Sequence, residues 1–166
     1  MYLLDANIFI TAKNLHYGFD FVPAFWEWID HGHTAGILCS TDKVRQELAA
    51  GADELSTWVG KRSAFFLSPD AKTLPSLQAV SQWATSRDFT AAAVAEFLSV
   101  ADFELVAYAH AHGHTVVTHE RPNPLSKRRI LIPDACEAFG VPWTSPYEML
   151  RSSGAQFVLG SHSPAA

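Results

Sequence analysis

Short apolar runs alternate with segments of helical spacing along most of the chain, and this order restricts the possible folds more than any other feature. Buried strands are expected at residues 2–4, 36–39 and 115–118, and an edge strand or packing segment at 65–67. Strands that alternate with helices form a parallel sheet with helices on both faces. The sequence therefore predicts an α/β fold of three layers, α/β/α, around a central, mostly parallel sheet of four or five strands.

Capping and breaking residues give the bounds of the remaining segments. The ranges typical of helices are 23–33, 42–51, 53–62, 74–85, 90–112, 133–139 and 146–152, of which 90–112 is long enough for two helices. Further brief strands are expected at 130–132 and 156–159. No repeat divides the chain, so residues 1–160 are predicted to form one domain and 161–166 a flexible tail.

The composition excludes several classes of protein. Of the 166 residues, 48% are apolar and 17% charged, which is incompatible with a disordered or fibrous chain. No apolar run approaches the roughly 18 residues of a membrane span, and no signal-peptide pattern follows Met1, so we expect a soluble, cytoplasmic protein with no membrane partner. The net charge of −5 argues against non-specific wrapping of duplex DNA, but it permits a nucleic-acid enzyme whose acidic site binds metal.

Asp5 directly follows the first apolar run. In a parallel α/β sheet, ligands gather at the carboxyl ends of the strands, so this position favours a functional carboxylate. A helix cap or an Asx turn is the alternative, because Asp often accepts a hydrogen bond from the backbone two or three residues further on.

Asp102 lies on the face of its helix that must be buried. It is aligned with Leu98, Leu105 and Val106, whereas Glu104 lies about 200° away around the helix and can be solvated. A buried, ionised carboxylate is costly in free energy, so Asp102 requires a cation, hydrogen-bond donors or a metal. The alternative is a cap at a junction between two helices.

Glu47 and Glu120 complete a group of four acids. Glu47 lies on the helix after the second strand, and Glu120 follows the strand 115–118 at the same sheet edge as Asp5. Ordinary surface ion pairs with neighbouring basic residues are the alternative for both. Converging carboxylates repel one another unless a divalent cation neutralises them, and all-oxygen ligation suits Mg²⁺ or Mn²⁺ rather than zinc.

The order and spacing of these acids, with their neighbours, carry a family resemblance. The matching segments are Tyr2-Leu3-Leu4-Asp5-Ala6-Asn7, Glu47, Ala101-Asp102 and Thr118-His119-Glu120. In this order they resemble the PIN-domain nucleases, including VapC-type toxins, over most of the chain. Residues 116–120, followed by 130–134 and Cys136, are most similar to an uncharacterised PIN-like branch found in bacterial toxin loci.

The resemblance implies a PIN-like domain that acts as a metal-dependent endoribonuclease, in which Mg²⁺ or Mn²⁺ activates water for hydrolysis of a phosphodiester bond. The catalytic acids that it implies are Asp5, Glu47, Asp102 and Glu120, with the metal on Asp5, Asp102 and Glu120, and with Asn7 and Thr118 holding the carboxylates. Many members of the family have Asp at the position of Glu120, and Asp134 is a competing candidate for the fourth acid.

RNA, single-stranded or structured, is the substrate that the resemblance implies. The basic residues expected to bind it are Arg121, Lys127, Arg128 and Arg129, for which a solvated loop with ordinary charges is the alternative. PIN-type toxins are generally inhibited by a cognate antitoxin that covers the acidic cleft, and many are homodimers. We therefore expect an antitoxin partner and a homodimer.

Two other functions stay open. A catalytically silent PIN-like scaffold would bind a protein partner through its aromatic surface. A haloacid-dehalogenase-like phosphatase would use Asp5 as its nucleophile, although position 7 is Asn where such an enzyme has an Asp. We assign His110, His112 and His114 a structural role at a helix end rather than a zinc site.

Overall fold

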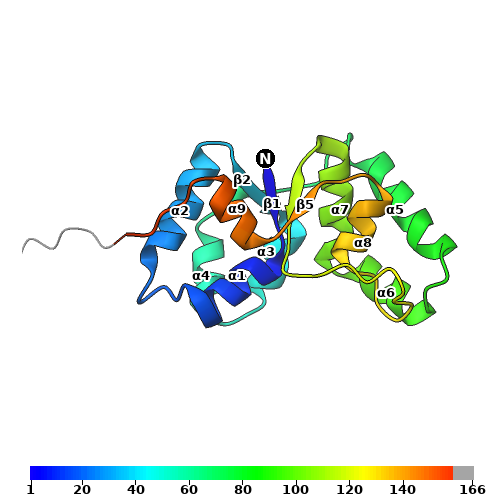
Figure 1. The fold of residues 1–166 in the computed structure, drawn as a ribbon, viewed down its shortest axis with the longest axis horizontal. Coiled ribbons are helices and arrows are strands. Elements are labelled where there is room, and N and C mark those ends of the chain that lie inside the picture. The colour runs from blue at the N-terminus through cyan, green and yellow to red at the C-terminus, as the bar shows by residue number, and fades with distance from the viewer. Residues whose placement is uncertain (159–166) are drawn as a thin grey trace, which may run out of the picture.

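The fold is a parallel sheet of five strands between two layers of helices, as predicted (Figure 1). The computed structural model describes residues 1–158, so the predicted tail 161–166 lies outside the described residues. The strand order is β3-β2-β1-β4-β5, and all four pairings are parallel. The strands are β1 (Tyr2–Leu4), β2 (Leu38–Thr41), β3 (Phe66–Leu67), β4 (Thr115–Val117) and β5 (Trp143–Thr144).

Nine α-helices are found within residues 1–158. They are α1 (Ala6–Thr11), α2 (Pro23–Thr34), α3 (Asp42–Ala49), α4 (Glu54–Gly60), α5 (Leu74–Ser86), α6 (Ala91–Ser99), α7 (Ala101–His112), α8 (Ile132–Ala138) and α9 (Pro146–Ser152). A π-helix (Ala12–His16) follows α1, and a 3-10 turn (Ser63–Phe65) precedes β3. Figure 1 shows α1, α2, α4 and α9 on one side of the sheet and α5, α6, α7 and α8 on the other. Helix α3 contacts both groups, through α4 and α7.

The order of the strands changes direction at β1. The chain continues from β1 to β2 and β3 on one side and then crosses to β4 and β5 on the other. In register, Leu4 at the end of β1 lies opposite Val117 at the end of β4. A crevice for ligands forms outside the carboxyl ends of the strands at such a switch point. The topology therefore directs attention to the residues that follow β1 and β4.

Local signals place the helices that border this edge. Thr41 caps α3, because its side chain accepts a hydrogen bond from the backbone N–H of Val44. The range 90–112 forms two helices, which meet at the extended residue Val100, so Asp102 lies in the first turn of α7. Gly113, at φ 68°, adopts the left-handed conformation that ends α7 and leads directly into β4.

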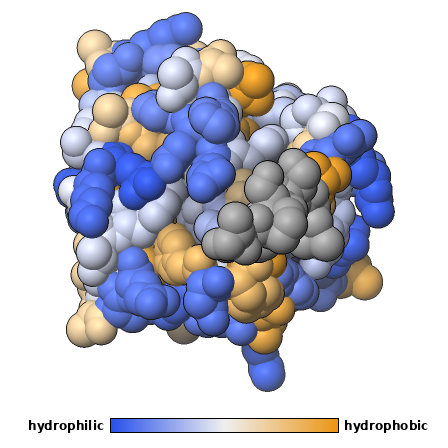
Figure 2. Space-filling model, turned by 90° about the vertical axis from the view of Figure 1, so that its left-hand side faces the viewer, coloured by the Kyte–Doolittle hydropathy of each residue, from blue (hydrophilic) through white to orange (hydrophobic). Residues whose placement is uncertain are grey.

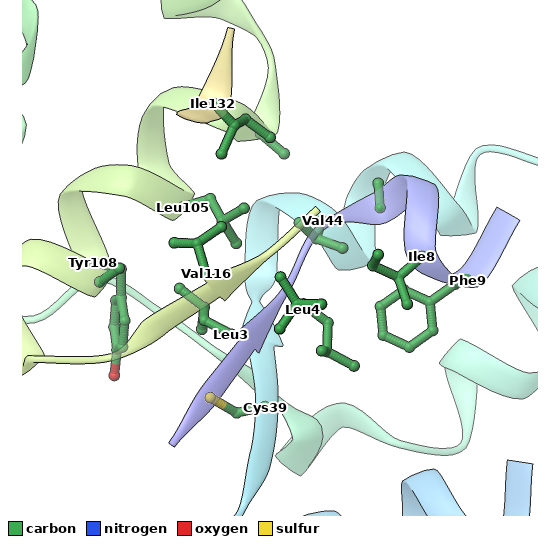
Figure 3. Close-up of a cluster of buried hydrophobic side chains, with 14 of the residues drawn as sticks. Leu3, Leu4, Ile8, Phe9, Cys39, Val44, Leu105, Tyr108, Val116 and Ile132 are labelled. Atoms are coloured by element: carbon green, nitrogen blue, oxygen red, sulfur yellow. The ribbon is translucent and has the colours of Figure 1, made fainter. Parts of the chain in front are cut away.

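Apolar side chains from both sides of the sheet meet in one core (Figure 3). Leu3 and Leu4 of β1, Val116 of β4 and Leu105 of α7 are at most 1% exposed. Full burial of each of the larger side chains stabilises the fold by about 2 kcal/mol. Phe9 of α1 packs edge-on against Phe65, with ring centroids 5.9 Å apart. Close packing on both faces of β1 thus fixes the position of the residue that follows the strand.

Two predicted strands are wrong. Residues 130 and 131 have no regular structure, and Ile132 begins α8, because Pro133 suits a first helical turn and cannot donate to a strand ladder. Residues 156–158 have no regular structure either, and Leu159 lies outside the described residues. The last strand is instead β5, which pairs with β4, while Phe157 packs against Tyr17 at a ring-centroid distance of 5.9 Å.

The surface is mixed in character. Figure 2 shows the face that carries α2, where polar side chains surround small, separate hydrophobic patches. One exposed apolar residue, Phe21, precedes this helix. In residues 1–158, none of the helices has the length and apolar character needed to span a membrane.

A candidate acidic site at the edge of the sheet

Asp5 lies at the carboxyl end of β1 and is only 1% exposed. Its carboxylate accepts a hydrogen bond from the hydroxyl of Thr118, at 2.9 Å. The pKa of Asp5 is raised to about 6, mainly by burial. The hydrogen bond from Thr118 opposes this shift, the charge of Glu120 adds to it, and hydrogen bonding by Asn7 also opposes it. The side chain therefore faces the end of β4, as its position in the sequence predicted.

Asp102 experiences the repulsion of the other three acids. Its pKa is raised to about 8, mainly by burial and then by the charges of Asp5, Glu120 and Glu47, in that order. Asp102 is not the N-cap of its helix, which is Val100, so the junction-cap alternative does not describe it. The four predicted acids thus come from four separate segments of the chain and act on one another at one edge of the sheet.

Glu47 and Glu104 connect the N-termini of α3 and α7. A carboxylate oxygen of Glu47, on α3, accepts a hydrogen bond from the backbone N–H of Ala101 at 2.8 Å. Glu104, on α7, accepts from the backbone N–H of Lys43 at 3.3 Å. Each helix thereby satisfies a free N–H in the first turn of the other. Glu104, which its place on the helix allows to be solvated, is half-buried, and this burial raises its pKa.

Glu120 makes close polar contacts with the loop that follows it. Its side chain, 11% exposed, accepts from the guanidinium of Arg129 and from the backbone N–H of Ile132, each at 2.7 Å. The backbone N–H of Glu120 donates to the hydroxyl of Thr118 at 3.1 Å. That hydroxyl also donates to Asp5, so Thr118 links the first and fourth acids, as its predicted positioning role requires.

As they stand, no three His, Cys, Asp or Glu side chains in residues 1–158 form a group able to hold a metal ion. Glu47 and Glu120 are engaged with N–H donors and with Arg129. The chemistry of the donor set nonetheless suits a hard divalent cation, because all four groups are carboxylates, and the pKa values of Asp5 and Asp102 are raised by burial and by the charges of neighbouring acids. A bound cation would relieve that repulsion.

The basic residues divide into two groups. Arg129 pairs with Glu120, and Lys127 forms an ion pair with Asp88, so two of the four cations expected to bind substrate are engaged with acids of this chain. Arg121 and Arg128 are exposed, and neither makes an ion pair within residues 1–158.

Asp134, the competing candidate for the fourth position, has another partner. Both of its carboxylate oxygens accept from the backbone N–H of Asn123, at 3.0 and 3.1 Å, which ties the loop after Glu120 to α8. The charge of Glu120, in contrast, is among those that raise the pKa of Asp5 and Asp102. Of the two candidates, Glu120 is the one placed to act on the other acids.

The histidines at the end of α7 make contacts typical of helix packing. His112 contacts Asp70 and Thr73, both at 3.3 Å, and His110 contacts the hydroxyl of Ser76 at 2.9 Å. These contacts tie α7 to α5 and the loop before it, in agreement with the structural role assigned to them.

Sequence reasoning missed a second polar group near the acids. His119, directly before Glu120, lies 6.1 Å from Tyr147 between ring centroids, and the hydroxyl of Tyr147 contacts His16 at 3.2 Å. His16 ends the π-helix, a local form that is frequent at functional sites but has no clear sequence signal.

The fold and this edge define the class of the molecule: a parallel α/β domain with four interacting carboxylates at its topological switch point. The chain belongs to the family described as Domain of unknown function (DUF4411), which matches residues 2–157. Neither the curated proteins nor the solved structures contain a match to this chain.

Proposed function

We propose that this protein is a metal-dependent endoribonuclease of the PIN type, which hydrolyses phosphodiester bonds of single-stranded or structured RNA. The observation that carries the proposal is the interaction of Asp5, Glu47, Asp102 and Glu120 at the carboxyl edge of the sheet. Like charges destabilise a fold, and pKa values perturbed by burial and by charged neighbours are concentrated at functional sites.

Asp5 and Asp102 would hold Mg²⁺ or Mn²⁺, with Glu120 as the third ligand. When bound, the cation would lower the pKa of a water molecule and offset the charge of the scissile phosphate. The hydroxyl of Thr118 fixes the orientation of Asp5. Glu47, held by the N–H of Ala101, is placed to position the attacking water or to join the ligands.

RNA is the substrate that fits the surroundings of the acids. Arg121 and Arg128 are exposed cations on the loop that begins at Glu120, and they can attract the phosphodiester backbone to the acidic edge. We further propose that the protein acts in the cytoplasm as the toxin of a toxin–antitoxin pair, forms a homodimer and is inhibited by an antitoxin that covers this edge.

The proposal is tested by cleavage of a mixed pool of structured and single-stranded RNA. The purified protein is incubated with Mg²⁺, Mn²⁺ or EDTA, beside a folded Asp102→Asn variant. We expect cleavage that requires metal and is lost in the variant. Equal cleavage by the variant and the parent protein would exclude the acidic edge as the catalytic site.

A catalytically silent scaffold is the second candidate, and the present partners of two acids favour it. Glu47 and Glu120 already hold backbone N–H groups and Arg129, as residues with a purely structural role would. The metal-binding isotherm separates the two functions. Weak Mn²⁺ binding that survives Asp5→Asn supports the scaffold, whereas binding lost in that variant supports the nuclease.

A further inference from the structure

A pocket of about 420 Å³ lies beside the loop that follows Glu120 and is separate from the four acids. It is bordered by the end of α5, the segment before α6, the loop 123–127 and α8. Residues that line it include Trp83, Arg87, Phe89, Leu125, Lys127 and Asp134. Its volume is within the range of roughly 300–1,000 Å³ that is usual for small-molecule sites.

Hydrogen bonds from both sides hold the loop that forms one wall. The backbone N–H of Thr90 donates to the carbonyl of Lys127 at 2.8 Å, and the side chain of Lys127 pairs with Asp88. At the other end of the loop, the N–H of Asn123 donates to the carboxylate of Asp134. The pocket is therefore built from fixed elements in this structure.

The lining combines aromatic rings with a cation. Trp83 and Phe89 are both half-buried, with ring centroids 5.6 Å apart and planes inclined at 67°. Aromatic side chains stack on nucleobases of any sequence, since every base has a π-face. Arg87 is exposed, lines the same pocket and makes no ion pair within residues 1–158, so its guanidinium is available to a phosphate group.

The same loop connects the pocket to the acids. The hydroxyl of Ser126, which lines the pocket, donates to the carbonyl of Arg129 at 2.9 Å. The guanidinium of Arg129 in turn contacts Glu120. A ligand in the pocket would thus lie against the segment that positions the fourth acid.

We propose that this pocket binds a nucleotide, with the base against Trp83 and Phe89 and a phosphate at Arg87. The nucleotide belongs to the RNA that the acidic edge cleaves, a part of the inference that rests on the proposed function. A free mononucleotide has the same chemistry, and the experiment separates the two sources.

Binding is measured without cleavage, by fluorescence anisotropy of a labelled single-stranded oligoribonucleotide in EDTA. Leu125→Asp places a negative charge at the rim of the pocket, where the wild-type residue is 88% exposed and its replacement leaves the core intact. Leu74→Asp is the matched control, because Leu74 is 61% exposed and begins α5, the helix whose other end carries Trp83. We expect Leu125→Asp and Arg87→Ala to weaken binding about tenfold, and Leu74→Asp to leave it unchanged.

Two competitors identify what the pocket recognises. An oligomer with abasic positions should bind about tenfold more weakly than the parent oligomer, because it lacks the stacking bases. Displacement of the labelled RNA by adenosine or uridine 5′-monophosphate supports a free nucleotide as the ligand, and displacement only by RNA supports a nucleotide within the chain. Equal binding of the abasic oligomer, or unchanged binding by both pocket variants, would overturn the proposal.

Binding and cleavage measurements can contradict the nucleotide pocket and the proposed nuclease independently. Metal-dependent cleavage by the wild-type protein, together with full RNA binding by Leu125→Asp and Arg87→Ala, overturns the pocket alone. Pocket-dependent binding of nucleotide, without cleavage in any metal, supports the pocket and overturns the proposed nuclease.

Discussion

The acids at the edge of the sheet and the acids on the helical surface have opposite electrostatic environments. On the surface, Asp42 accepts from Arg45 at 2.7 Å and Asp53 pairs with Lys13, contacts that lower the pKa of both carboxyls. At the edge, burial and mutual repulsion raise the pKa of Asp5 and Asp102 to about 6 and about 8. Because this arrangement lowers the stability of the fold, the difference supports the functional role proposed for the edge acids.

Removing one acid from each region should give the largest contrast in activity. If the protein is the proposed nuclease, Asp5→Asn is expected to lower the rate of RNA cleavage about 100-fold or more, because it removes a charge that would bind the metal. Asp53→Asn, at a surface ion pair, should leave the rate unchanged. Initial rates in Mg²⁺, with folding of both variants checked by circular dichroism, measure the contrast. An equal loss of cleavage rate in the two variants would show that the edge acids matter no more for activity than the surface acids.

Neutralising an acid should stabilise the fold at the edge of the sheet and destabilise it on the helical surface. The pKa of Asp102 is higher in the folded protein than its ordinary value of 3.8, so the contribution of Asp102 to stability is greatest below about pH 4 and falls as the pH rises toward 8. Asp102→Asn should therefore raise the free energy of unfolding by several kcal/mol at pH 8 and have almost no effect near pH 4. Urea denaturation across this pH range measures the difference.

Asp42→Asn is the matched variant for that experiment. Its pKa is lowered by the contact with Arg45, so its contribution to stability is present above the ordinary pKa and is lost as the pH falls. The substitution should lower the free energy of unfolding at pH 8 by less than about 1 kcal/mol. Destabilisation at pH 8 by Asp102→Asn as well would show that the edge acids are structural.

Thr118→Val should show how one hydrogen bond affects stability and the pKa of Asp5. The buried hydroxyl donates to Asp5 and accepts from the N–H of Glu120, so its loss is expected to lower the free energy of unfolding by about 1–2 kcal/mol. Since this bond opposes the raised pKa of Asp5, the pKa should rise further in the variant. Carboxyl NMR titration tests the second effect, with Thr118→Ser as the control that retains the hydroxyl. A pKa equal to that of wild type in Thr118→Val would contradict the assigned contact.

The smallest effect is expected at Arg129. Because its guanidinium occupies Glu120, Arg129→Ala should free this carboxylate and raise the affinity for Mn²⁺ by about three- to fivefold, which is under about 1 kcal/mol. Arg151→Ala is the control, since Arg151 makes a similar pair with Glu148 on α9. Isothermal titration calorimetry measures both variants. Weaker Mn²⁺ binding in Arg129→Ala would show that Arg129 supports the site instead of competing for it.

Much of the fold could be predicted from short-range patterns. The apolar run before Asp5 and the β-branched run after Gly113 form the two strands that flank the switch point. The errors at 130–132 and 156–158 share a cause, because short apolar runs also occur at helix starts and in packed loops. The strand Trp143–Thr144 was missed because two residues next to a proline carry no periodicity.

Local sequence patterns were enough to predict the three-layer class, the positions of Asp5 and Glu120 after strands, and the presence of Asp102 in a helix with a buried face. These features follow from hydrophobic periodicity and from capping residues, which act within a few residues along the chain. The hydrogen-bond donors that the acids face, in contrast, depend on tertiary packing. Glu47 accepts a hydrogen bond from Ala101, which is 54 positions away in the sequence, and Asp5 accepts one from Thr118, which is 113 positions away. Such pairs arise only when packing brings distant segments together, and no local pattern specifies them.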